Sequence, residues 1–436
     1  MIMAHLPLQG VRVIDFTVVW SGPSVTMYLG DLGAEVIRMD NPWVFPSSTR
    51  GLVARPSPQL MAMMGILGGA YPDRDPGERP WDRAAMFNMH ARGKKLATLD
   101  LRKESGREHF LSLVEKSDVL VENNNITVLE HLGIDPETLH KRNPKLVILR
   151  LPPLGQDGPY STYLGLGAHF EALAGVTAVR GYADSAPATT TSVFQMDPAA
   201  GATGAFAVLA ALRRRAQTGK GEVIELPQVE NEMLHLGEMY LDAASTGNPS
   251  APMGNRDRNY LQGAYPAAGE DKWVSITIRG DADWAELIAE MGNPAWAAND
   301  RFTTQAGRLA AQDEIDEQIR TWTSGRSRED TFHALQARGV PAGPLYNEED
   351  VFNDPHVAAR GMLREIESAH AGTYKYPAHH WHWTGPDLKW EPISGMGLDN
   401  EYVYKEVIGL TDAEYQQAIA DGHIAEGYLN PDGTYA

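Results

Sequence analysis

Asp197 is the residue whose type and surroundings most directly suggest chemistry. It lies in the stretch Gln-Met-Asp-Pro at 195–198, directly before a small and apolar run at 199–212 and three arginines at 213–215. This pattern predicts a helix with Asp197 as its N-cap and Pro198 as its first residue. Backbone N–H groups and the helix dipole keep a carboxylate ionised at such an end. The local sequence therefore favours a purely structural helix cap for Asp197, and a functional carboxylate is the alternative.

Other polar residues are candidates for ligand contacts. Basic residues flank a predicted strand at 97–101, and they are Arg92, Lys94, Lys95, Arg102 and Lys103. They form either a solvated loop or a phosphate contact. Three asparagines at 123–125 follow a predicted strand at 119–121, where they form a loop or contact a ligand. The closely spaced histidines at 379, 380 and 382 match no known ligand spacing, so no metal site is predicted.

The composition narrows the class of protein. The 436 residues exceed one simple core and predict at least two domains, and 43% apolar with 22% charged residues is ordinary for a globular protein. The net charge of −19 argues against nucleic acid or an anionic membrane as the main partner. There is no cysteine, no signal-peptide pattern at the N-terminus, and no apolar run of the ~20 residues that a membrane span requires. We therefore expect a cytoplasmic protein with no membrane partner.

The elements that must position these residues follow an alternating pattern. A strand at 11–16, a helix at 21–32 and a strand at 34–39 form a βαβ unit, without the GxGxxG of a dinucleotide site. Further strands are predicted at 146–151 and 222–226, and a further helix at 106–116. The first 210 or so residues thus predict a doubly wound α/β domain, and residues from 273 to about 339 a smaller α+β domain.

Short motifs occur along the chain in the order typical of one known family. They are Leu8-Gln9-Gly10, Ser21-Gly22-Pro23, the stretch 31–38, Leu99-Asp100-Leu101, the stretch 118–123, Gly158-Pro159-Tyr160, Thr218-Gly219-Lys220-Gly221, Val340-Pro341-Ala342 and Asp354-Pro355-His356. The ordered set covers nearly the whole chain and resembles the class III CoA-transferase family, also called the CaiB/BaiF family. The resemblance implies an enzyme of acyl-CoA metabolism.

The resemblance also implies an architecture. It implies an α/β fold with a large doubly wound, Rossmann-like domain and a smaller α+β domain, in a dimer whose two subunits interlock as rings. Residues 1–215 would form the first part of the large domain, residues 216–340 the linker and small domain, and residues 341–436 the return segment. The partners implied are acyl-CoA and carboxylic acid substrates and a second copy of the chain, or a paralogous subunit in a heteromer.

By the same resemblance, Asp197 is the nucleophile of an acyl-CoA:carboxylate CoA-transferase, because Asp197 and Gly201 match the family's Asp-x-x-x-Gly. The reaction would pass through an aspartyl-CoA thioester. It would use no metal and no tightly bound cofactor, with coenzyme A entering as part of the substrate. Residues at positions where the family contacts CoA are Val19, Trp20, Arg38, Asn41, Leu99, Arg102, Asn123 and His131.

The sequence departs from the family pattern in two places. Gly167 stands where several transferases carry an acid and the racemases carry part of a His-Asp pair, so His169 or Glu171 would have to assist instead. The glycine-rich lid would fall at 254–263, where Arg256 and Arg258 replace the glycine run and are candidates for binding a substrate carboxylate.

These departures leave two alternatives. The chain is either an active transferase or a CoA-binding subunit of a hetero-oligomeric transferase with weak activity of its own. An α-methylacyl-CoA racemase is the less favoured third reading, because two-base proton transfer requires a second group that Gly167 does not supply. The acyl donor and acid acceptor are not identified by the sequence.

Overall fold

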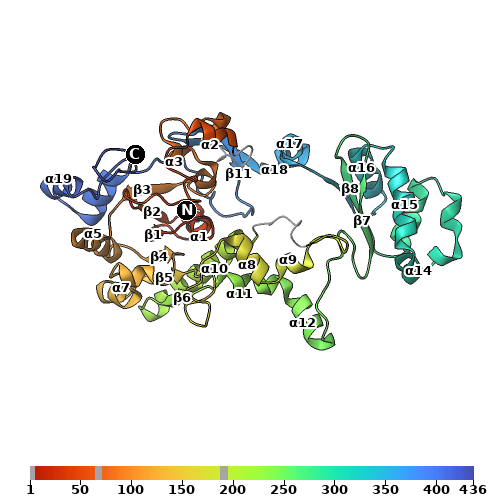
Figure 1. Cartoon of the computed structure of the whole chain (residues 1–436), viewed down its shortest axis with the longest axis horizontal. Helices are drawn as coiled ribbons and strands as arrows, with labels where there is room; N and C mark the ends of the chain where they lie inside the picture. Colours follow the sequence, from red (N-terminus) through yellow and green to blue (C-terminus); the bar gives the residue numbers. More distant parts are fainter. Residues whose placement is uncertain (1–4, 64–70, 187–194) are drawn as a thin grey trace. The chain divides into compact units, whose positions relative to one another are not determined.

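A six-stranded parallel sheet forms the centre of the larger of two compact units (Figure 1). The structure is a computed structural model and describes residues 5–63, 71–186 and 195–436. The strands are β1 (Arg12–Phe16), β2 (Glu35–Asp40), β3 (Lys94–Thr98), β4 (Val119–Glu122), β5 (Val147–Arg150) and β6 (Val223–Glu225). Their order is β3-β2-β1-β4-β5-β6, and every neighbouring pair is parallel. This confirms the predicted doubly wound α/β class.

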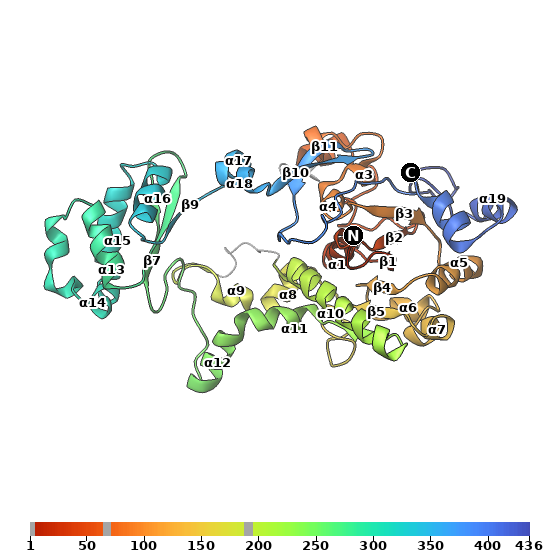
Figure 2. The same ribbon diagram turned by 180° about the vertical axis from the view of Figure 1, so that it is seen from behind.

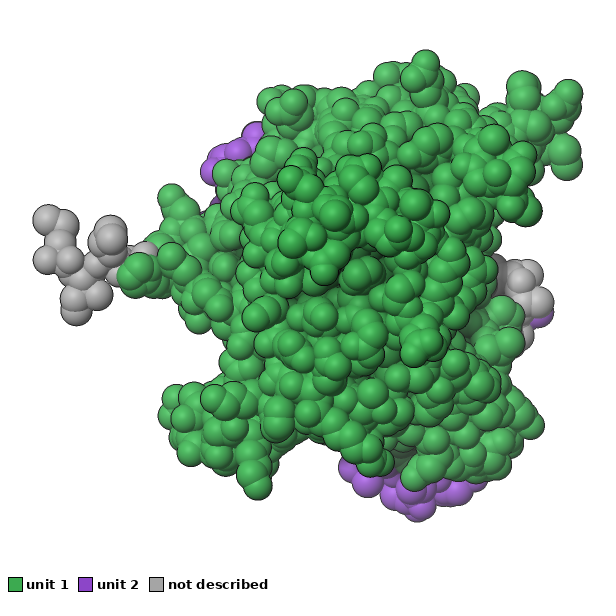
Figure 3. Space-filling view, turned by 90° about the vertical axis from the view of Figure 1, so that its left-hand side faces the viewer, with its two compact units in different colours: residues 1–175, 192–240, 361–436 green, residues 176–191, 241–360 purple. Residues whose placement is uncertain are grey.

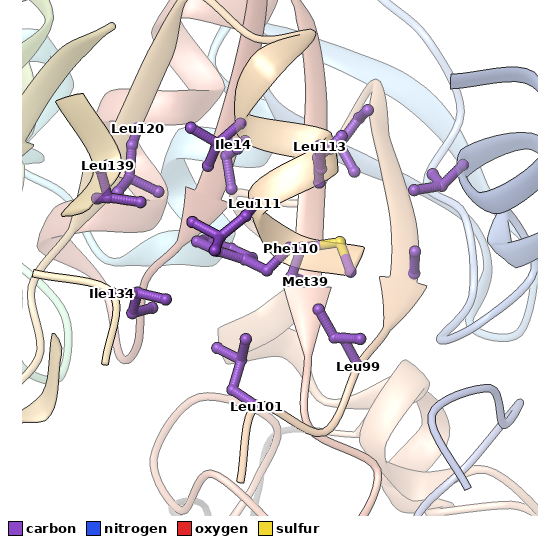
Figure 4. Close-up of a cluster of buried hydrophobic side chains, with 14 of the residues drawn as sticks. Ile14, Met39, Leu99, Leu101, Phe110, Leu111, Leu113, Leu120, Ile134 and Leu139 are labelled. Carbon is purple, nitrogen blue, oxygen red and sulfur yellow. The ribbon is translucent and has the colours of Figure 1, made fainter. Parts of the chain in front are cut away.

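Helices cover both faces of this sheet, because neighbouring residues of a strand point to opposite sides. On one face, Val13 and Leu149 pack against α1 (Ser21–Asp31) and α10 (Met196–Thr218). On the other face, Ile14 and Leu120 pack against α5 (Glu104–Glu115), α7 (Pro136–Arg142), the π-helix η7 (Tyr402–Ile408) and α19 (Asp412–Ala420). Figure 4 shows this second cluster, and Figure 2 shows the sheet from behind. The C-terminal segment therefore completes the core that the N-terminal strands begin.

The third strand begins earlier than the sequence predicts. A strand was expected at 97–101, but β3 runs from Lys94 to Thr98 and pairs with β2 from Val36 onward. Lys94 enters the sheet because its ammonium is buried against the carboxylate of Asp15, at 2.8 Å. A tertiary ion pair, which the local sequence does not reveal, thus moves the strand toward the N-terminus.

The larger unit comprises residues 1–175, 192–240 and 361–436 (Figure 3). Its short elements are α2 (Pro58–Met63), η2 (Pro72–Arg74), α3 (Pro80–Arg83), α4 (Ala85–Asn88), α6 (Val128–His131), α8 (Gly167–Leu173), α11 (Gln228–Met233), η4 (Leu234–Leu236), β10 (Leu363–Ser368) and β11 (Gly372–Pro377). Strands β10 and β11 form an antiparallel pair. Helix α12 (Gly237–Thr246) begins in this unit and ends in the other.

The smaller unit comprises residues 176–191 and 241–360. An antiparallel sheet of β7 (Leu261–Pro266), β8 (Trp273–Ile278) and β9 (Ala342–Leu345) packs its apolar face on a core around Trp284, Phe302 and Ile319. Its helices are α9 (Val176–Val179), α13 (Asp281–Glu290), η5 (Ala295–Ala298), η6 (Asp300–Phe302), α14 (Gln305–Ala310), α15 (Gln312–Thr323), α16 (Arg328–Ala337), α17 (Glu348–Asn353) and α18 (Pro355–Arg360). The domain boundaries near 215 and 340 stay predictions.

None of the helices in the described ranges is both long enough and apolar enough to cross a membrane.

Candidate active site

A pocket opens at the carboxyl ends of β1 and β4, where the strand order changes direction. Residues that follow β1 (Val18, Val19, Ser21) and β4 (residues 123–126) line it together with Asp197. Its volume is about 150 Å³. Open α/β sheets bind ligands at this topological switch point, because the loops after the two strands diverge there and leave a crevice. The sheet topology therefore selects this pocket as the candidate site.

Two helices bring Asp197 into the pocket. Helices α1 and α10 run side by side in the same direction, since Gly201 faces Ser24 and Gly204 faces Val25. A Cβ atom added to Gly201 would lie 2.6 Å from the Cβ of Ser24, and one added to Gly204 would lie 2.8 Å from Val25. The glycines thus permit a separation that any larger side chain would prevent. As a result, the N-termini of the two helices lie next to each other.

Asp197 is not the N-cap that the sequence predicts. Helix α10 begins at Met196 with Gln195 as its N-cap, so Asp197 is the second helical residue. The hydroxyl and the backbone N–H of Ser21, the first residue of α1, act as donors toward its carboxylate and lower the pKa of Asp197. The ionised carboxylate of Asp197 is therefore stabilised by donors from the neighbouring helix α1 and by the dipole of its own helix α10.

The charge state of Asp197 also differs from the expectation. Burial raises the pKa of Asp197 to about 6, and the nearby Glu171 carboxylate acts in the same direction. The hydrogen bonds from Ser21 oppose this rise without cancelling it. The helix end was expected to keep the carboxylate fully ionised. Only 9% of the residue remains exposed, however, and the cost of desolvating its charge exceeds the stabilisation that the helix end provides.

Asn123 fixes Ser21 in place. Its amide oxygen accepts the N–H of Val18 at 2.7 Å, and its amide nitrogen donates to the carbonyl of Val18 at 2.8 Å and to the Ser21 hydroxyl at 3.1 Å. Hydrogen bonds thus join the end of β4 through Asn123 to Ser21, the residue whose donors lower the pKa of Asp197. In the sequence, Ser21 is recognisable only as part of the Ser21-Gly22-Pro23 motif, which predicts no role for its side chain.

Val19 lies in the pocket in a strained conformation. Its φ is +59°, a left-handed value that is unfavourable for a β-branched residue. Two buried side chains hold it there: its N–H donates to Thr49 Oγ1 at 2.7 Å, and its carbonyl contacts His90 Nε2 at 3.1 Å. Trp20 follows it as a half-buried residue directly before α1. The structure therefore brings Val19 and Asn123, of the eight predicted CoA-contact residues, into the Asp197 pocket.

Two predicted CoA-contact residues belong to the protein interior. Arg38 is 2% exposed and forms ion pairs with Asp15 and Asp40 on β1 and β2, at 3.4 and 3.2 Å. Leu99 is buried in the apolar cluster of Figure 4. Both side chains stabilise the sheet, and a direct contact with a ligand would require the surrounding residues to separate.

Of three others, Arg102 and His131 are exposed and Asn41 is half-buried. Asn41 and Arg102 follow β2 and β3, and both side chains contact Asp100, Asn41 at 3.5 Å and Arg102 at 2.7 Å. The Arg102 side chain is half exposed, so it can meet a phosphate without a large desolvation cost. His131 is exposed at the end of α6. These residues lie outside the set that lines the Asp197 pocket.

The candidate assisting residues lie on α8. Gly167 begins this helix and lines the pocket. His169 is exposed, and its Nδ1 accepts the N–H of Leu166 at 3.1 Å. Glu171 is buried, and its Oε1 accepts the N–H of Gln195 at 3.0 Å. Of the three, Glu171 is the one whose side chain contacts the start of the helix that carries Asp197.

Arg256 and Arg258 lie in the smaller unit, where acids already bind them. Arg256 forms ion pairs with Asp313 and Asp316 on α15, and Arg258 forms one with Asp242 on α12. A substrate carboxylate would therefore compete with protein carboxylates at either residue. The histidines near the C-terminus serve packing: His379 Nε2 donates a hydrogen bond to the Lys389 carbonyl, and His380 lies edge-on against Tyr28. Across the described ranges, no three His, Cys, Asp or Glu side chains are grouped to hold a metal.

Comparison with known proteins gives this fold and site a family. The model of CoA-transferase family III matches residues 8–395, and the chain belongs to that family. A succinyl-CoA–D-citramalate CoA-transferase of Chloroflexus aurantiacus is 29% identical over 93% of this chain and 95% of its own length. The crystal structure of a CaiB/BaiF family protein from Brucella suis is 28% identical, with a TM-score of 0.79 over 92% of this chain and all of that one. This chain is therefore an enzyme of the CoA-transferase class.

One relative is much longer. A probable CoA-transferase of Mycobacterium tuberculosis is 28% identical over 95% of this chain, which spans only half of that protein's length. The alpha and beta subunits of a succinyl-CoA–L-malate CoA-transferase of Chloroflexus aurantiacus are also similar, at 30% and 29% identity.

Proposed function

We propose that this protein is an acyl-CoA:carboxylate CoA-transferase that works through a thioester on Asp197. The observation that carries the proposal is the position of Asp197, which is the one acid among the described residues that line the switch-point pocket. The citramalate relative named above and an acetyl-CoA:oxalate CoA-transferase of Acetobacter aceti, 29% identical, carry names of this reaction type.

The reaction consists of four displacements at carbonyl carbon. The Asp197 carboxylate attacks the acyl-CoA thioester and expels CoA thiolate. The product is a mixed anhydride of Asp197 and the acyl group. The thiolate attacks the aspartyl carbonyl, which releases the first acid and forms the aspartyl-CoA thioester. The acceptor carboxylate attacks this thioester and displaces the thiolate, which finally attacks the acceptor's acyl carbonyl. The new acyl-CoA leaves, and Asp197 is a carboxylate again, with no proton or electron gained or lost.

The residues around Asp197 suit this sequence. A carboxylate with a pKa near 6 is still mostly ionised at neutral pH, and it is more basic, hence more nucleophilic, than an ordinary aspartate. The donors of Ser21 beside the carboxylate favour one orientation of it, and a fixed orientation turns a reaction between separate molecules into one between oriented groups. The same N–H and O–H groups can stabilise the oxygen of Asp197 that becomes charged when its own carbonyl is attacked.

The CoA moiety is proposed to extend along the carboxyl edge of the sheet. The pantetheine end would enter the pocket past Val19, Trp20 and Asn123, and Arg102 with Asn41 would meet a phosphate at the ends of β3 and β2. A role of Arg38 and Leu99 would be indirect, through the sheet that they stabilise. Further candidates for contacts with CoA or the substrate are His131, His169, Arg256 and Arg258. Gly167 has no side chain and so leaves space for the substrate in the pocket.

The assembly is proposed to be an interlocked homodimer in the cytoplasm. The chain leaves the larger unit for the smaller one at 176–191 and again at 241–360, and a long excursion that returns to its starting unit is the kind of open loop that interlocking uses. A second candidate is a subunit of a heteromer, favoured by the similarity to the two named Chloroflexus subunits. Assaying the purified chain alone separates them, because a subunit would bind CoA without turnover.

The direct test is the exchange of CoA between an acyl-CoA and a labelled free acid. Asp197→Asn keeps the size of the side chain, and we expect it to abolish exchange while CoA binding, measured by calorimetry, is retained. Hydroxylamine should trap the wild-type enzyme as a hydroxamate at Asp197, detected in the tryptic peptide by mass spectrometry. Exchange that survives in Asp197→Asn would refute the proposal. Screening donors against acids then identifies the substrates, and deuterium entry at the α-carbon would indicate racemase activity.

A further inference from the structure

The turn formed by Val18 and Val19, between β1 and α1, has its backbone polar groups bound by side chains. The N–H and the carbonyl of Val18 pair with the side-chain amide of Asn123, at 2.7 and 2.8 Å. The N–H of Val19 donates to Thr49 Oγ1 at 2.7 Å, and the Val19 carbonyl lies 3.1 Å from His90 Nε2. Both residues of the turn line the switch-point pocket. Three side chains from distant segments of the chain therefore fix one wall of this pocket.

Val19 requires this support because of its backbone conformation. Its φ is +59°, and among the described residues it is the only β-branched one with a φ in the left-handed region. A branched side chain makes this region costly, whereas glycine adopts it about as readily as the right-handed one. The cost is comparable with the contribution of one or two hydrogen bonds. Without its two partners, Val19 would relax to a negative φ and displace the wall of the pocket.

His90 supports Val19 as a neutral donor. A carbonyl oxygen only accepts hydrogen bonds, so the Nε2 atom that faces Val19 carries the proton. His90 is 2% exposed, and burial lowers the pKa of its ring well below the usual range. The nearby charges of Lys94 and Arg38 act in the same direction, while Asp15 and the contact with Val19 oppose them. At neutral pH the ring therefore has one N–H group, which is directed at the Val19 carbonyl.

A buried arginine anchors both partners of Val19. Arg50 directly follows Thr49, is fully buried and forms an ion pair with Asp40 at the end of β2, at 2.6 Å. Its guanidinium also lies 3.7 Å from the ring centre of Phe87, three residues before His90. Ion pairs and cation–π contacts that are shielded from water restrict side chains strongly. One side chain thus connects the two segments, both between β2 and β3, that carry Thr49 and His90.

We propose that Thr49 and His90 are positioning residues of the CoA-transferase reaction, which hold Val19 in its left-handed conformation so that the pocket accepts the thioester end of acyl-CoA. The inference rests on the proposed location of the active site at the pocket of Asp197. Enzyme in which Val19 has relaxed does not bind the substrate productively, so the apparent affinity falls with the fraction of left-handed turns. Enzyme that has bound the substrate has the correct turn, so kcat is retained.

A double-mutant cycle of Thr49→Val and Val19→Gly tests the proposal. Thr49→Val keeps the size of the side chain and removes the acceptor of the Val19 N–H. We expect KM for acyl-CoA to rise roughly tenfold, while kcat changes by less than about twofold, because the substrate selects the left-handed fraction. In the Val19→Gly background the same substitution should raise KM about twofold at most, since glycine keeps about half of its population at positive φ.

The remaining variants separate positioning from a general loss of structure. Thr49→Ser retains the hydroxyl and should keep KM near the wild-type value. Thr331→Val is the matched control, because Thr331 is as buried as Thr49 but donates to the Ser327 carbonyl at the start of α16 in the smaller unit. It should change neither kcat nor KM. Equal effects of Thr49→Val in the two backgrounds would overturn the proposal, and so would a fall in kcat at an unchanged KM.

His90 provides the same test should Thr49→Val fail to fold. His90→Phe keeps a ring of similar size and removes the donor, whereas His90→Gln places an amide N–H group near the position of Nε2. KM should rise in His90→Phe, recover in His90→Gln, and rise less in the Val19→Gly background. An unchanged KM in His90→Phe, or an equal rise in both backgrounds, would overturn the proposal.

The two hypotheses fail separately. Exchange that survives in Asp197→Asn refutes the nucleophile, whatever the cycle gives. If Asp197→Asn abolishes exchange and the cycle shows no coupling between positions 49 and 19, only the role of Thr49 and His90 is refuted.

Discussion

At the scale of single residues, the site depends on a balance around one carboxylate. Burial and Glu171 raise the pKa of Asp197, and the donors of Ser21 lower it. A fully ionised, well-solvated aspartate would be a weak nucleophile, and a fully buried one would keep its proton at neutral pH. The observed value near 6 lies between these limits.

Asp197 should reduce the stability of the protein at neutral pH. Its pKa is about 6 in the folded state against an ordinary 3.8, so the folded state keeps a proton that the unfolded chain loses between these values. Stability is therefore lost as pH rises from about 4 to 6, by about 3 kcal/mol in total. We expect Asp197→Asn to be more stable than wild type at pH 8 and equally stable near pH 3.5, in urea unfolding. The exposed Asp157→Asn serves as control, and an equal gain at both pH values would contradict the expectation.

Ser21→Ala should make Asp197 harder to ionise. It removes one donor to ionised Asp197 and leaves the backbone N–H, so the pKa of Asp197 should rise and the acidic limb of the pH–rate profile should move up. Hydrogen bonds to charged groups contribute about 1.5–3 kcal/mol, so kcat should fall tenfold or more. Ser24→Ala is the matched control, because the Ser24 hydroxyl donates to the Trp20 carbonyl instead. If the acidic limb of the pH–rate profile does not move in Ser21→Ala, the contact between Ser21 and Asp197 is contradicted.

At the scale of elements, the pairing of α1 with α10 positions the site. The two helices meet through Gly201 and Gly204, and this close packing places Ser21 beside Asp197. The loops after β1 and β4 supply the remaining walls. Catalytic geometry thus depends on residues that touch no substrate.

Gly201→Ala should separate the two helices. The new methyl group would lie 2.6 Å from the Cβ of Ser24, so one helix must move. We expect a loss of about 1–3 kcal/mol in the free energy of unfolding, as for other overpacked cores, together with a reduced kcat. Adding Ser24→Gly to the variant removes the clash and should restore much of kcat. The added glycine lowers the helix propensity of α1, so the free energy of unfolding should not recover fully. If the double variant is no more active than Gly201→Ala, the separation of α1 and α10 is not the cause.

At the scale of the whole molecule, the chain path is the main feature. The larger unit is assembled from three separate parts of the sequence, and the C-terminal part contributes η7 and α19 to its core. The smaller unit has an apolar core of its own. Each unit therefore has the burial that an independent fold requires, although one chain passes through both.

Interlocking gives a testable property of the proposed dimer. Two closed loops that pass through each other cannot separate while both remain folded. Tagged and untagged homodimers mixed under native conditions should form no mixed dimers, as judged by affinity capture, whereas unfolding and refolding them together should. Mixed dimers that form without unfolding would rule out interlocking, and a monomer in light scattering would rule out the dimer.

The sequence by itself determined the α/β class, the first βαβ unit, the family and Asp197 as the candidate nucleophile. These follow from apolar periodicity and from short motifs, which are local properties of the chain. Only the tertiary structure decided that Asp197 lies inside the helix, that β3 begins at Lys94, that Arg38 is buried between acids, and that Ser21 and Glu171 surround the nucleophile. Burial and hydrogen bonds between distant segments decide these features, and neither is encoded in any one stretch of the chain.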